Sequence, residues 1–359
     1  MLWSVTKPTD PGLYWLDTIH KDFYRGLFSG NTFNNCFITS FNTVLRASSK
    51  TKRRFQTVFT LFNELEAVHQ NTFKNIYNNH LNYRAYFAST RVGILRPSEE
   101  HNALWEAVKK LGGYLYATTI DLVCYKTAAV GNPSMDEHYE CYKSDNNIVC
   151  CFCGTEEMME ERLIEPEEGA ENDDEKQWRA SYDHFLPKKH YPFLAVDFDN
   201  LIPCCQKCNE KAKGELDVLE YENTRTLAFF PYHPTEVVSL EATATKFLET
   251  RNIRIDIVAT GDPSYEKADT WNRTFKVLTR VNKRLKSFNE SWLAPVLQGV
   301  TDARTKLNQE KARCDRFKKS ERDAYFKALC FDEISTKTDK ELTALLETVE
   351  QIYSPRQSL

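Results

Sequence analysis

Two stretches in the first 140 or so residues carry apolar side chains three or four positions apart. They are Phe55, Val58, Phe59, Phe62 and Leu65, followed by Phe73, Ile76, Tyr77 and Leu81. This spacing places the apolar side chains along one face of a helix. Ser98-Glu99-Glu100 predicts the start of a further helix, and Gly112-Gly113 predicts its end. We therefore expect residues 1–140 to form a helical domain that acts as a scaffold or binds a partner.

After Pro234 the pattern of apolar positions is again helical. One long helix is predicted from a core-facing stripe of Trp271, Phe275, Leu278, Val281, Leu285 and Phe288. Two more helices are predicted, over approximately 301–330 and over 338–352. We expect residues 239–359 to form a second helical domain.

The composition is that of a soluble globular protein. Of its 359 residues, 41% are hydrophobic and 27% are charged, which excludes a disordered or fibrous chain. The sequence has no apolar run of about 18 residues and no basic segment followed by an apolar one at its start. We therefore expect a cytoplasmic protein without a membrane span. The net charge of -4 excludes a protein that coats nucleic acid by bulk charge, but it leaves a local site open.

Charge is distributed unevenly along the chain. Residues 151–180 contain eleven acidic and three basic side chains, and we interpret 155–176 as a solvated acidic insertion. Residues 271–327 contain fifteen basic and six acidic side chains. The resulting basic helical face is either ordinary solvated surface or a surface that contacts nucleic-acid phosphates. Candidate phosphate contacts on this face are Arg280, Lys283 and Arg284.

Cysteine is the most unusual residue in the composition. The chain has 11 cysteines, and seven of them lie in one central stretch. Two pairs have the two-residue separation that lets both thiolates reach one metal ion, and together they predict a structural Zn²⁺ site. The pairs are Cys150 with Cys153 and Cys205 with Cys208. The neighbouring Cys151 and Cys204 make the register ambiguous locally. The alternative is that these cysteines are buried or redox-active side chains.

Between the cysteine pairs lies a set of polar residues that suits metal-assisted phosphodiester hydrolysis. Asp183 and His184 are adjacent, Asn200 opens a second short apolar run, and Asn209 follows the last cysteine. Carboxylate and amide oxygens suit a hard divalent cation. A neutral imidazole can take a proton from water. The cation then neutralises charge on the phosphate and on the leaving oxygen.

This region resembles the HNH endonucleases, whose core is a β-hairpin and a helix around one divalent metal. The resemblance covers roughly residues 141–238 and is closest to a bacterial subgroup found in Septu-type and retron-linked antiphage systems. The matching elements are Cys150-x-x-Cys153-Gly154, Asp183-His184-Phe185-Leu186-Pro187-Lys188, Tyr191-Pro192, Asn200-Leu201-Ile202-Pro203, Cys205-x-x-Cys208-Asn209 and Phe230-Pro231-Tyr232. The implied fold class is mainly α with a small α+β centre, in which two helical domains flank a zinc-stapled ββα-metal domain at 141–238.

The resemblance also implies a role for each matching residue. His184 would be the general base that activates the attacking water. Asp183 and Asn209 would hold the catalytic divalent ion, most simply Mg²⁺ or Mn²⁺. Asn200 would hold the hairpin loop and help to orient the histidine. The four paired cysteines would hold the structural zinc and would not touch the substrate.

One position departs from the family pattern. Many members have a lysine three residues after the final Asn or His, where this chain has Ala212. We assign the phosphate contacts of the core to Lys213 and Lys188. The alternatives for single residues are that His184 is a structural histidine and that Asp197 and Asp199 only shape the turn before Asn200.

The function that we expect is a metal-dependent HNH endonuclease that cleaves DNA in bacterial antiphage defence. It would act alone or as the effector subunit beside an ATPase or nucleotide-sensing partner. The alternative is a catalytically silent, zinc-containing nucleic-acid-binding or adaptor protein. The presence of all four polar residues of the motif speaks against that alternative.

Overall fold

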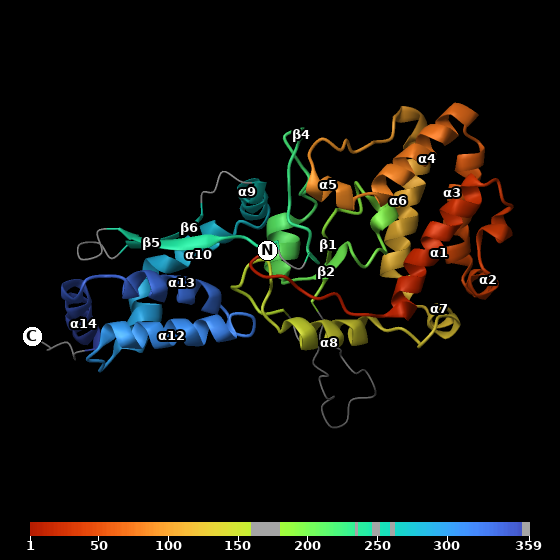
Figure 1. Ribbon diagram of the computed structural model, residues 1–359. Helices are drawn as coiled ribbons and strands as arrows, with labels where there is room; N and C mark the ends of the chain where they lie inside the picture. The colour runs from red at the N-terminus through yellow and green to blue at the C-terminus, as the bar shows by residue number, and fades with distance from the viewer. Residues whose placement is uncertain (159–179, 234–235, 246–251, 259–262, 354–359) are drawn as a thin grey trace, which may run out of the picture.

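The computed structural model describes residues 1–158, 180–233, 236–245, 252–258 and 263–353 (Figure 1). Within these residues the chain is mostly helical and contains small pairs of antiparallel strands. This confirms the coarse fold class, and the assignment of the centre to the HNH family stays a prediction. Most of the acidic insertion predicted over 155–176 lies outside the described residues. No helix in the described part is long and apolar enough to span a membrane.

The N-terminal region is a set of packed helices. They are α1 (Pro11–Phe28), α2 (Thr39–Ala47), α3 (Ser49–Asn63), α4 (Ala67–Leu81), α5 (Arg84–Ala88), α6 (Asn102–Ala117), α7 (Val123–Ala128) and α8 (Met135–Asn146), with the 3-10 turns η1 (Phe33–Cys36), η2 (Glu99–His101) and η3 (Thr119–Asp121). Helix α1 begins at Pro11, and the side chain of Asp10 accepts a hydrogen bond from the backbone N–H of Leu13 at 3.0 Å. This N-cap satisfies one of the N–H groups that a helix leaves unpaired at its start.

The two apolar stripes predicted in this region are confirmed. Phe55, Val58 and Phe62 are buried on α3, and Phe73 and Ile76 are buried on α4. Helix α3 covers residues 49–63 and α4 covers residues 67–81, so each stripe falls almost entirely within one helix. The buried face of each helix provides its main stabilisation, because apolar surface is removed from water.

The helix end predicted at Gly112-Gly113 is wrong. Helix α6 continues through both glycines to Ala117. Gly112 is needed for packing: a Cβ atom there would lie 2.7 Å from the carbonyl oxygen of Pro192 and 2.8 Å from the Cβ of Ala195. A glycine inside a helix lets another backbone approach closely, at a cost in helix propensity. Local sequence alone does not distinguish a glycine that allows close packing inside a helix from a glycine that ends the helix.

The centre of the molecule is built from short elements. Strand β1 (Tyr182–His184) pairs antiparallel with β2 (Leu201–Pro203), so that His184 lies opposite Leu201. The loop between them contains the 3-10 turn η4 (Pro192–Leu194), and β2 leads into the π-helical segment η5 (Lys207–Lys213). The small hairpin of β3 (Glu220–Tyr221) and β4 (Thr224–Arg225) follows. Figure 1 shows β1 and β2 between the N-terminal helices and the C-terminal elements.

After residue 239 the described chain begins with a hairpin, which the helical prediction missed. Strand β5 (Leu240–Thr245) pairs antiparallel with β6 (Asn252–Ile257). Along β5, buried or half-buried Leu240, Ala242 and Ala244 alternate with exposed side chains. This period of two is the pattern of a strand with one covered face.

The remaining elements are helical. They are α9 (Pro263–Phe275), α10 (Val277–Arg284), η6 (Leu285–Ser287), η7 (Asn289–Leu293), α11 (Ala294–Leu297), α12 (Ala303–Phe317), α13 (Ala324–Ser335) and α14 (Asp339–Tyr353). The stripe from Trp271 to Phe288 is buried as predicted, but its helix is interrupted at Lys276, where φ is +52°. The run predicted over 301–330 is likewise divided between α12 and α13.

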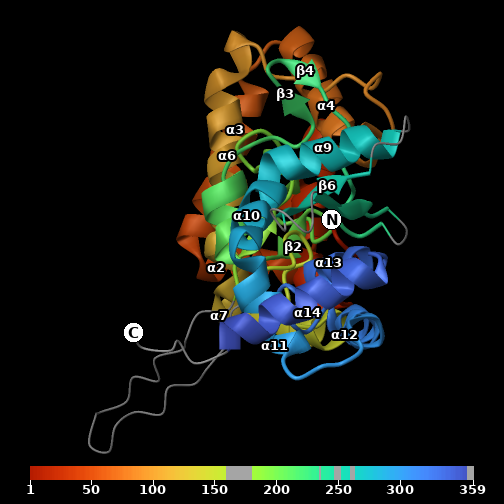
Figure 2. The ribbon, with the colours of Figure 1, turned by 90° about the vertical axis from the view of Figure 1, so that its left-hand side faces the viewer.

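The buried hydrophobic side chains form one contiguous cluster that extends from Met1 to Val349. The first residues contribute to its centre. The Leu2 N–H donates to the carbonyl of Cys151 at 2.9 Å, and the Val238 N–H donates to the carbonyl of Met1 at 2.8 Å. The N-terminal residue accordingly lies among the central elements in both ribbon views (Figures 1 and 2). The boundaries at 140/141 and 238/239 stay a prediction.

Buried histidines, His20 and His80 among them, make the stability of this fold depend on pH. Burial lowers the pKa of His20 to about 3 and that of His80 to about 4. Both imidazoles are therefore neutral in the folded chain, while the unfolded chain binds protons below about pH 6.5. We expect each histidine to cost about 1.4 kcal/mol of unfolding free energy per pH unit as the pH falls from 6 to 4.

Urea unfolding at a series of pH values measures this effect. His20→Phe, which keeps a ring in the core, should remove the contribution of one histidine from the slope. The matched change His69→Phe, at a half-buried position, is the control. An identical pH slope for His20→Phe and the unmodified chain would contradict the prediction.

Candidate active site and metal centre

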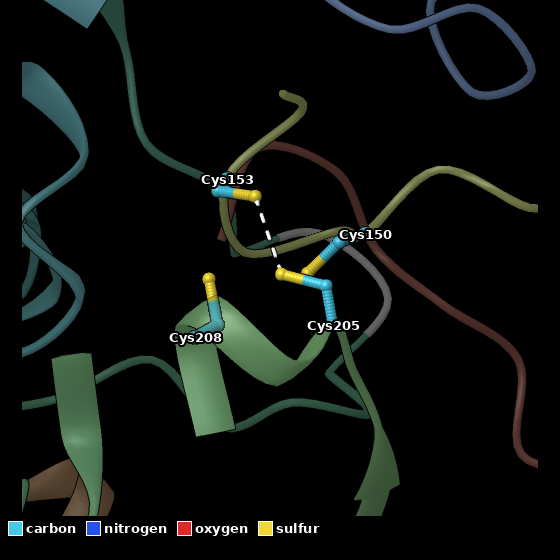
Figure 3. Close-up of side chains that lie close together, drawn as sticks. All are labelled: Cys150, Cys153, Cys205 and Cys208. Atoms are coloured by element: carbon cyan, nitrogen blue, oxygen red, sulfur yellow. Dashed lines mark hydrogen bonds between the residues drawn. The ribbon is translucent and has the colours of Figure 1, made fainter. Parts of the chain in front are cut away.

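Four cysteines from two distant segments meet in the centre of the molecule. All four side chains are buried, and their sulfur atoms lie within 4.8 Å of one another (Figure 3). The Sγ atoms of Cys153 and Cys205 are 3.8 Å apart. Four sulfurs at the tetrahedral Zn–S distance of ~2.3 Å would be separated by about 3.8 Å. The donor set, its burial and its spacing therefore fit one structural Zn²⁺, held by the residues predicted for it: Cys150, Cys153, Cys205 and Cys208.

Tight turns bring each cysteine pair into this arrangement. The Gly154 N–H donates to the carbonyl of Cys150 at 2.8 Å, and Gly154 has a φ of +64°, which favours glycine. In the second pair, the Cys208 N–H donates to the carbonyl of Cys205 at 3.0 Å. Cys151 and Cys204 are also buried but do not belong to the cluster, which resolves the ambiguity of register.

The structure places Arg280 against the sulfur cluster. Its Nη2 donates to the Sγ of Cys208 at 3.3 Å and to the carbonyl of Phe275 at 3.0 Å. The sequence suggested a DNA-phosphate contact for this residue, but its side chain is engaged inside the protein. A Zn²⁺ ion with four thiolates carries a net negative charge, and burying such a charge is costly unless it is paired. The same cost of burying a negative charge raises the pKa of the thiols of Cys150 and Cys208.

Because Arg280 would supply the opposing charge to a cysteine-bound zinc, its loss should weaken metal retention. We expect Arg280→Met to release zinc to a chromophoric chelator at least tenfold faster than the unmodified chain, since second-sphere hydrogen bonds typically affect metal affinity 10- to 100-fold. Lys283→Met, an exposed position on the same helix, is the control. Equal release rates for the two variants would show that Arg280 does not support the cluster.

His184 is held at the end of β1 by one hydrogen bond. Its Nε2 lies 2.9 Å from the carbonyl oxygen of Ala195. A carbonyl can only accept, so Nε2 carries the proton and Nδ1 is the acceptor nitrogen. Burial, and secondarily Lys188, lowers the pKa of His184 to about 3. The imidazole is therefore neutral at physiological pH, with one nitrogen able to take a proton.

Asp183 forms a buried ion pair with Lys213. The Lys213 Nζ donates to Asp183 Oδ1 at 2.9 Å and to the carbonyl of His184 at 2.8 Å. The Lys213 side chain is only 1% exposed, so it does not reach the surface where a phosphate contact was expected. The pair attaches η5 to β1 directly beside the histidine. Burial raises the pKa of Asp183, although Lys213 opposes this shift.

The two asparagines of the motif have different surroundings. Asn200 is buried, and its Oδ1 accepts from the Leu186 N–H at 2.7 Å while its Nδ2 donates to the carbonyls of Leu186 and Leu194. These bonds tie the β1–β2 loop together. Asn209 is half-buried at the start of η5, and its backbone N–H donates to the carbonyl of Cys205. Asn209 therefore follows directly from the turn that contains Cys205 and Cys208.

Asp197 and Asp199 attach the β1–β2 loop to the N-terminal helices. The Asp199 N–H donates to Asp197 Oδ1 at 2.9 Å, which shapes the turn before Asn200. Asp197 also pairs with Lys21 at 3.2 Å, and Asp199 pairs with Arg84 and, at 2.6 Å, with Lys7. The sequence pointed to the turn but not to these ion pairs, because their partners lie more than a hundred residues away.

The remaining predicted phosphate contacts differ in exposure. Lys188 and Lys283 are exposed. Arg284 instead donates to Asp323 and to Glu156, each at 2.7 Å, and thereby links α10 to the segment that follows the first cysteine pair.

Tyr116, which the sequence did not single out, packs edge-on against His184 with ring centroids 4.6 Å apart. No local sequence motif marks Tyr116, because only the packing of α6 against the β1–β2 loop brings it to His184.

Comparison with known proteins gives one partial similarity. No protein-family model matches the chain, and no solved structure is similar to it. The chain is 48% identical over 74 residues to the Septu protein PtuB of Bacillus thuringiensis. The matched segment covers 21% of this chain and 21% of that protein, so each protein is similar to the other over about a fifth of its length.

Proposed function

We propose that this chain is a metal-dependent HNH endonuclease that hydrolyses phosphodiester bonds in DNA and acts in antiphage defence. The observation that carries the proposal is the state of His184, a neutral imidazole whose Nε2 is tied to the Ala195 carbonyl. Its Nδ1 is thereby the atom that would take a proton from water. The partial identity to a Septu protein supports the defence context.

Asp183 and Asn209 would hold the catalytic divalent ion, Mg²⁺ or Mn²⁺. Asp183 Oδ1 is occupied by Lys213, whereas its buried Oδ2 has no hydrogen-bond partner among the described residues. A buried carboxylate oxygen without a partner is costly unless a cation or a donor satisfies it. Carboxylate and amide oxygens suit Mg²⁺. The bound ion would stabilise negative charge on the phosphate and on the leaving oxygen.

The chain's own residues supply the other steps. His184 would accept the proton of the attacking water at Nδ1, while the Ala195 carbonyl holds the ring in one tautomer. Lys188 is exposed close to Tyr116 and would bind a backbone phosphate. Exposed lysines on the C-terminal helices, Lys283 and Lys286, would add to the affinity, because each neutralised phosphate strengthens binding and its salt dependence.

Cleavage of supercoiled plasmid tests this proposal. We expect the purified chain, alone or with an ATPase or nucleotide-sensing partner, to produce nicked or linear DNA when Mg²⁺ or Mn²⁺ is added. A weak chelator that removes these ions but leaves the cysteine-bound zinc in place should stop the reaction. Salt-dependent binding of the plasmid without any cleavage would instead favour a catalytically silent DNA-binding protein.

A further inference from the structure

Helix α6 belongs to the N-terminal helical region, yet its last turns lie against the loop of the central hairpin. Gly112 makes this contact: a Cβ atom at this position would lie 2.7 Å from the carbonyl oxygen of Pro192 and 2.8 Å from the Cβ of Ala195. Both distances are shorter than real Cβ contacts, so only a glycine permits this approach. Helix α6 also packs against α3 of its own region, and its Val108, Leu111 and Leu115 are buried.

The loop residue that Gly112 contacts is also the one that orients His184. The Ala195 carbonyl receives the hydrogen bond from His184 Nε2 at 2.9 Å. Any displacement of Ala195 relative to β1 would lengthen or misalign this bond. The tautomer and direction of the imidazole therefore depend on the distance between α6 and the loop.

One helical turn after Gly112, the same helix contacts His184 directly. The Tyr116 ring meets the His184 ring edge-on, with centroids 4.6 Å apart and planes at 74°. The Nζ of Lys188 lies 5.4 Å from the centroid of the same Tyr116 ring. Tyr116 is thus in contact with the candidate base and with a candidate phosphate-binding lysine. Residues four apart on a helix share one face, so Gly112 and Tyr116 act on the site together.

We infer that α6 positions the general base of the nuclease: Gly112 sets the place of the Ala195 carbonyl, and Tyr116 supports the imidazole ring of His184. This inference rests on the proposed function and extends it, because it makes the N-terminal helical region part of the active site. Gly112 and Tyr116 are positioning residues, since they act through His184. A small shift of α6 would misplace the proton-accepting nitrogen and leave the exposed lysines of the C-terminal helices where they are.

Two neighbouring glycines provide a matched test. Gly112→Ala introduces the clash with Pro192 and Ala195, whereas a Cβ atom at Gly113 would meet nothing within 4 Å. We expect Gly112→Ala to lower the cleavage turnover number 10- to 100-fold with little change in KM for DNA, because misplacing a catalytic group by about 1 Å costs up to this much. Gly113→Ala should cleave at the unmodified rate. Thermal unfolding shows whether Gly112→Ala still folds.

Tyr116 variants keep the inference testable if Gly112→Ala does not fold. Tyr116→Ala should also lower turnover, and Tyr116→Phe, which keeps the ring, should retain more of the rate than Tyr116→Ala. A second readout is independent of activity: the ring signal of His184 in the NMR spectrum of histidine-labelled protein, assigned by its absence in His184→Gln. This signal should move in Gly112→Ala and Tyr116→Ala and stay in place in Gly113→Ala.

These measurements separate the two proposals. If the unmodified chain cleaves no DNA either alone or with an ATPase or nucleotide-sensing partner, but the His184 signal moves as described, the positioning by α6 stands and the nuclease assignment fails. If the chain cleaves DNA and neither Gly112→Ala nor Tyr116→Ala differs from Gly113→Ala in turnover or in the His184 signal, the positioning inference is overturned.

Discussion

His184→Ala is expected to slow plasmid cleavage by about 10²–10⁴-fold, the usual contribution of a general base. The effect should fall on turnover, because His184 is buried and is assigned a proton transfer, whereas DNA binding is assigned to exposed lysines. Plasmid affinity, measured by filter binding at several salt concentrations, should remain that of the unmodified chain. The time course of nicking gives the rate.

The matched control for this prediction is His190→Ala, a half-buried histidine of the same loop. It should cleave at close to the unmodified rate, which would exclude a general effect of losing an imidazole nearby. Equal cleavage by the unmodified chain and by His184→Ala would mean that the base lies elsewhere or that the activity comes from a contaminant.

Removing the metal from the cysteine cluster is expected to unfold the centre of the molecule. The cluster joins the turn of Cys150 and Cys153 to the start of η5, and Arg280 attaches α10 to it. Structural Zn²⁺ contributes apparent folding free energies of ~10–16 kcal/mol in small zinc domains, so its loss is comparable to the whole stability of a typical domain, about 5–15 kcal/mol. We expect one zinc per chain as purified.

Cys205→Ser tests this prediction, and Cys141→Ser, at an exposed thiol outside the cluster, is its control. The first variant should lose zinc and lose backbone amide protection in β1, β2 and η5 by hydrogen exchange. The second should keep both. A chain that is purified without zinc, or a Cys205→Ser variant that remains fully protected, would show that the cluster holds no structural metal.

The parts of the molecule that could be predicted from the sequence are those determined by local spacing. The two cysteine pairs could be predicted because a two-residue separation fits one turn and one ion. The stripes on α3 and α4 could be predicted because each helix buries a single face. The hairpin of β5 and β6 was missed although its alternation is visible in Leu240 to Thr245, because the helices that follow dominate the surrounding pattern.

The parts that could not be predicted depend on contacts between distant residues. Gly112 is a packing glycine only because Pro192 and Ala195 lie against it, and Arg280 is turned inward only because Cys208 is there to accept its hydrogen bond. The same applies to Lys213, whose position in the sequence suggested an exposed side chain. In each case the local pattern allowed two outcomes, and the tertiary partner decided between them.

The cysteine cluster also closes a loop, since Cys153 and Cys205 are 52 positions apart. Both ends of the acidic segment inside that loop are tied down: the Met158 N–H donates to the carbonyl of Ile148 at 2.7 Å, and Ser181 adjoins β1. The entropy of closing a loop grows only slowly with its length, by about 0.6 kcal/mol for each doubling. A metal bound by the four cysteines would therefore constrain the unfolded chain by only about 0.6 kcal/mol more than it would across a span half as long, so the stabilisation that the cluster brings through chain entropy depends little on how many residues separate the two cysteine pairs.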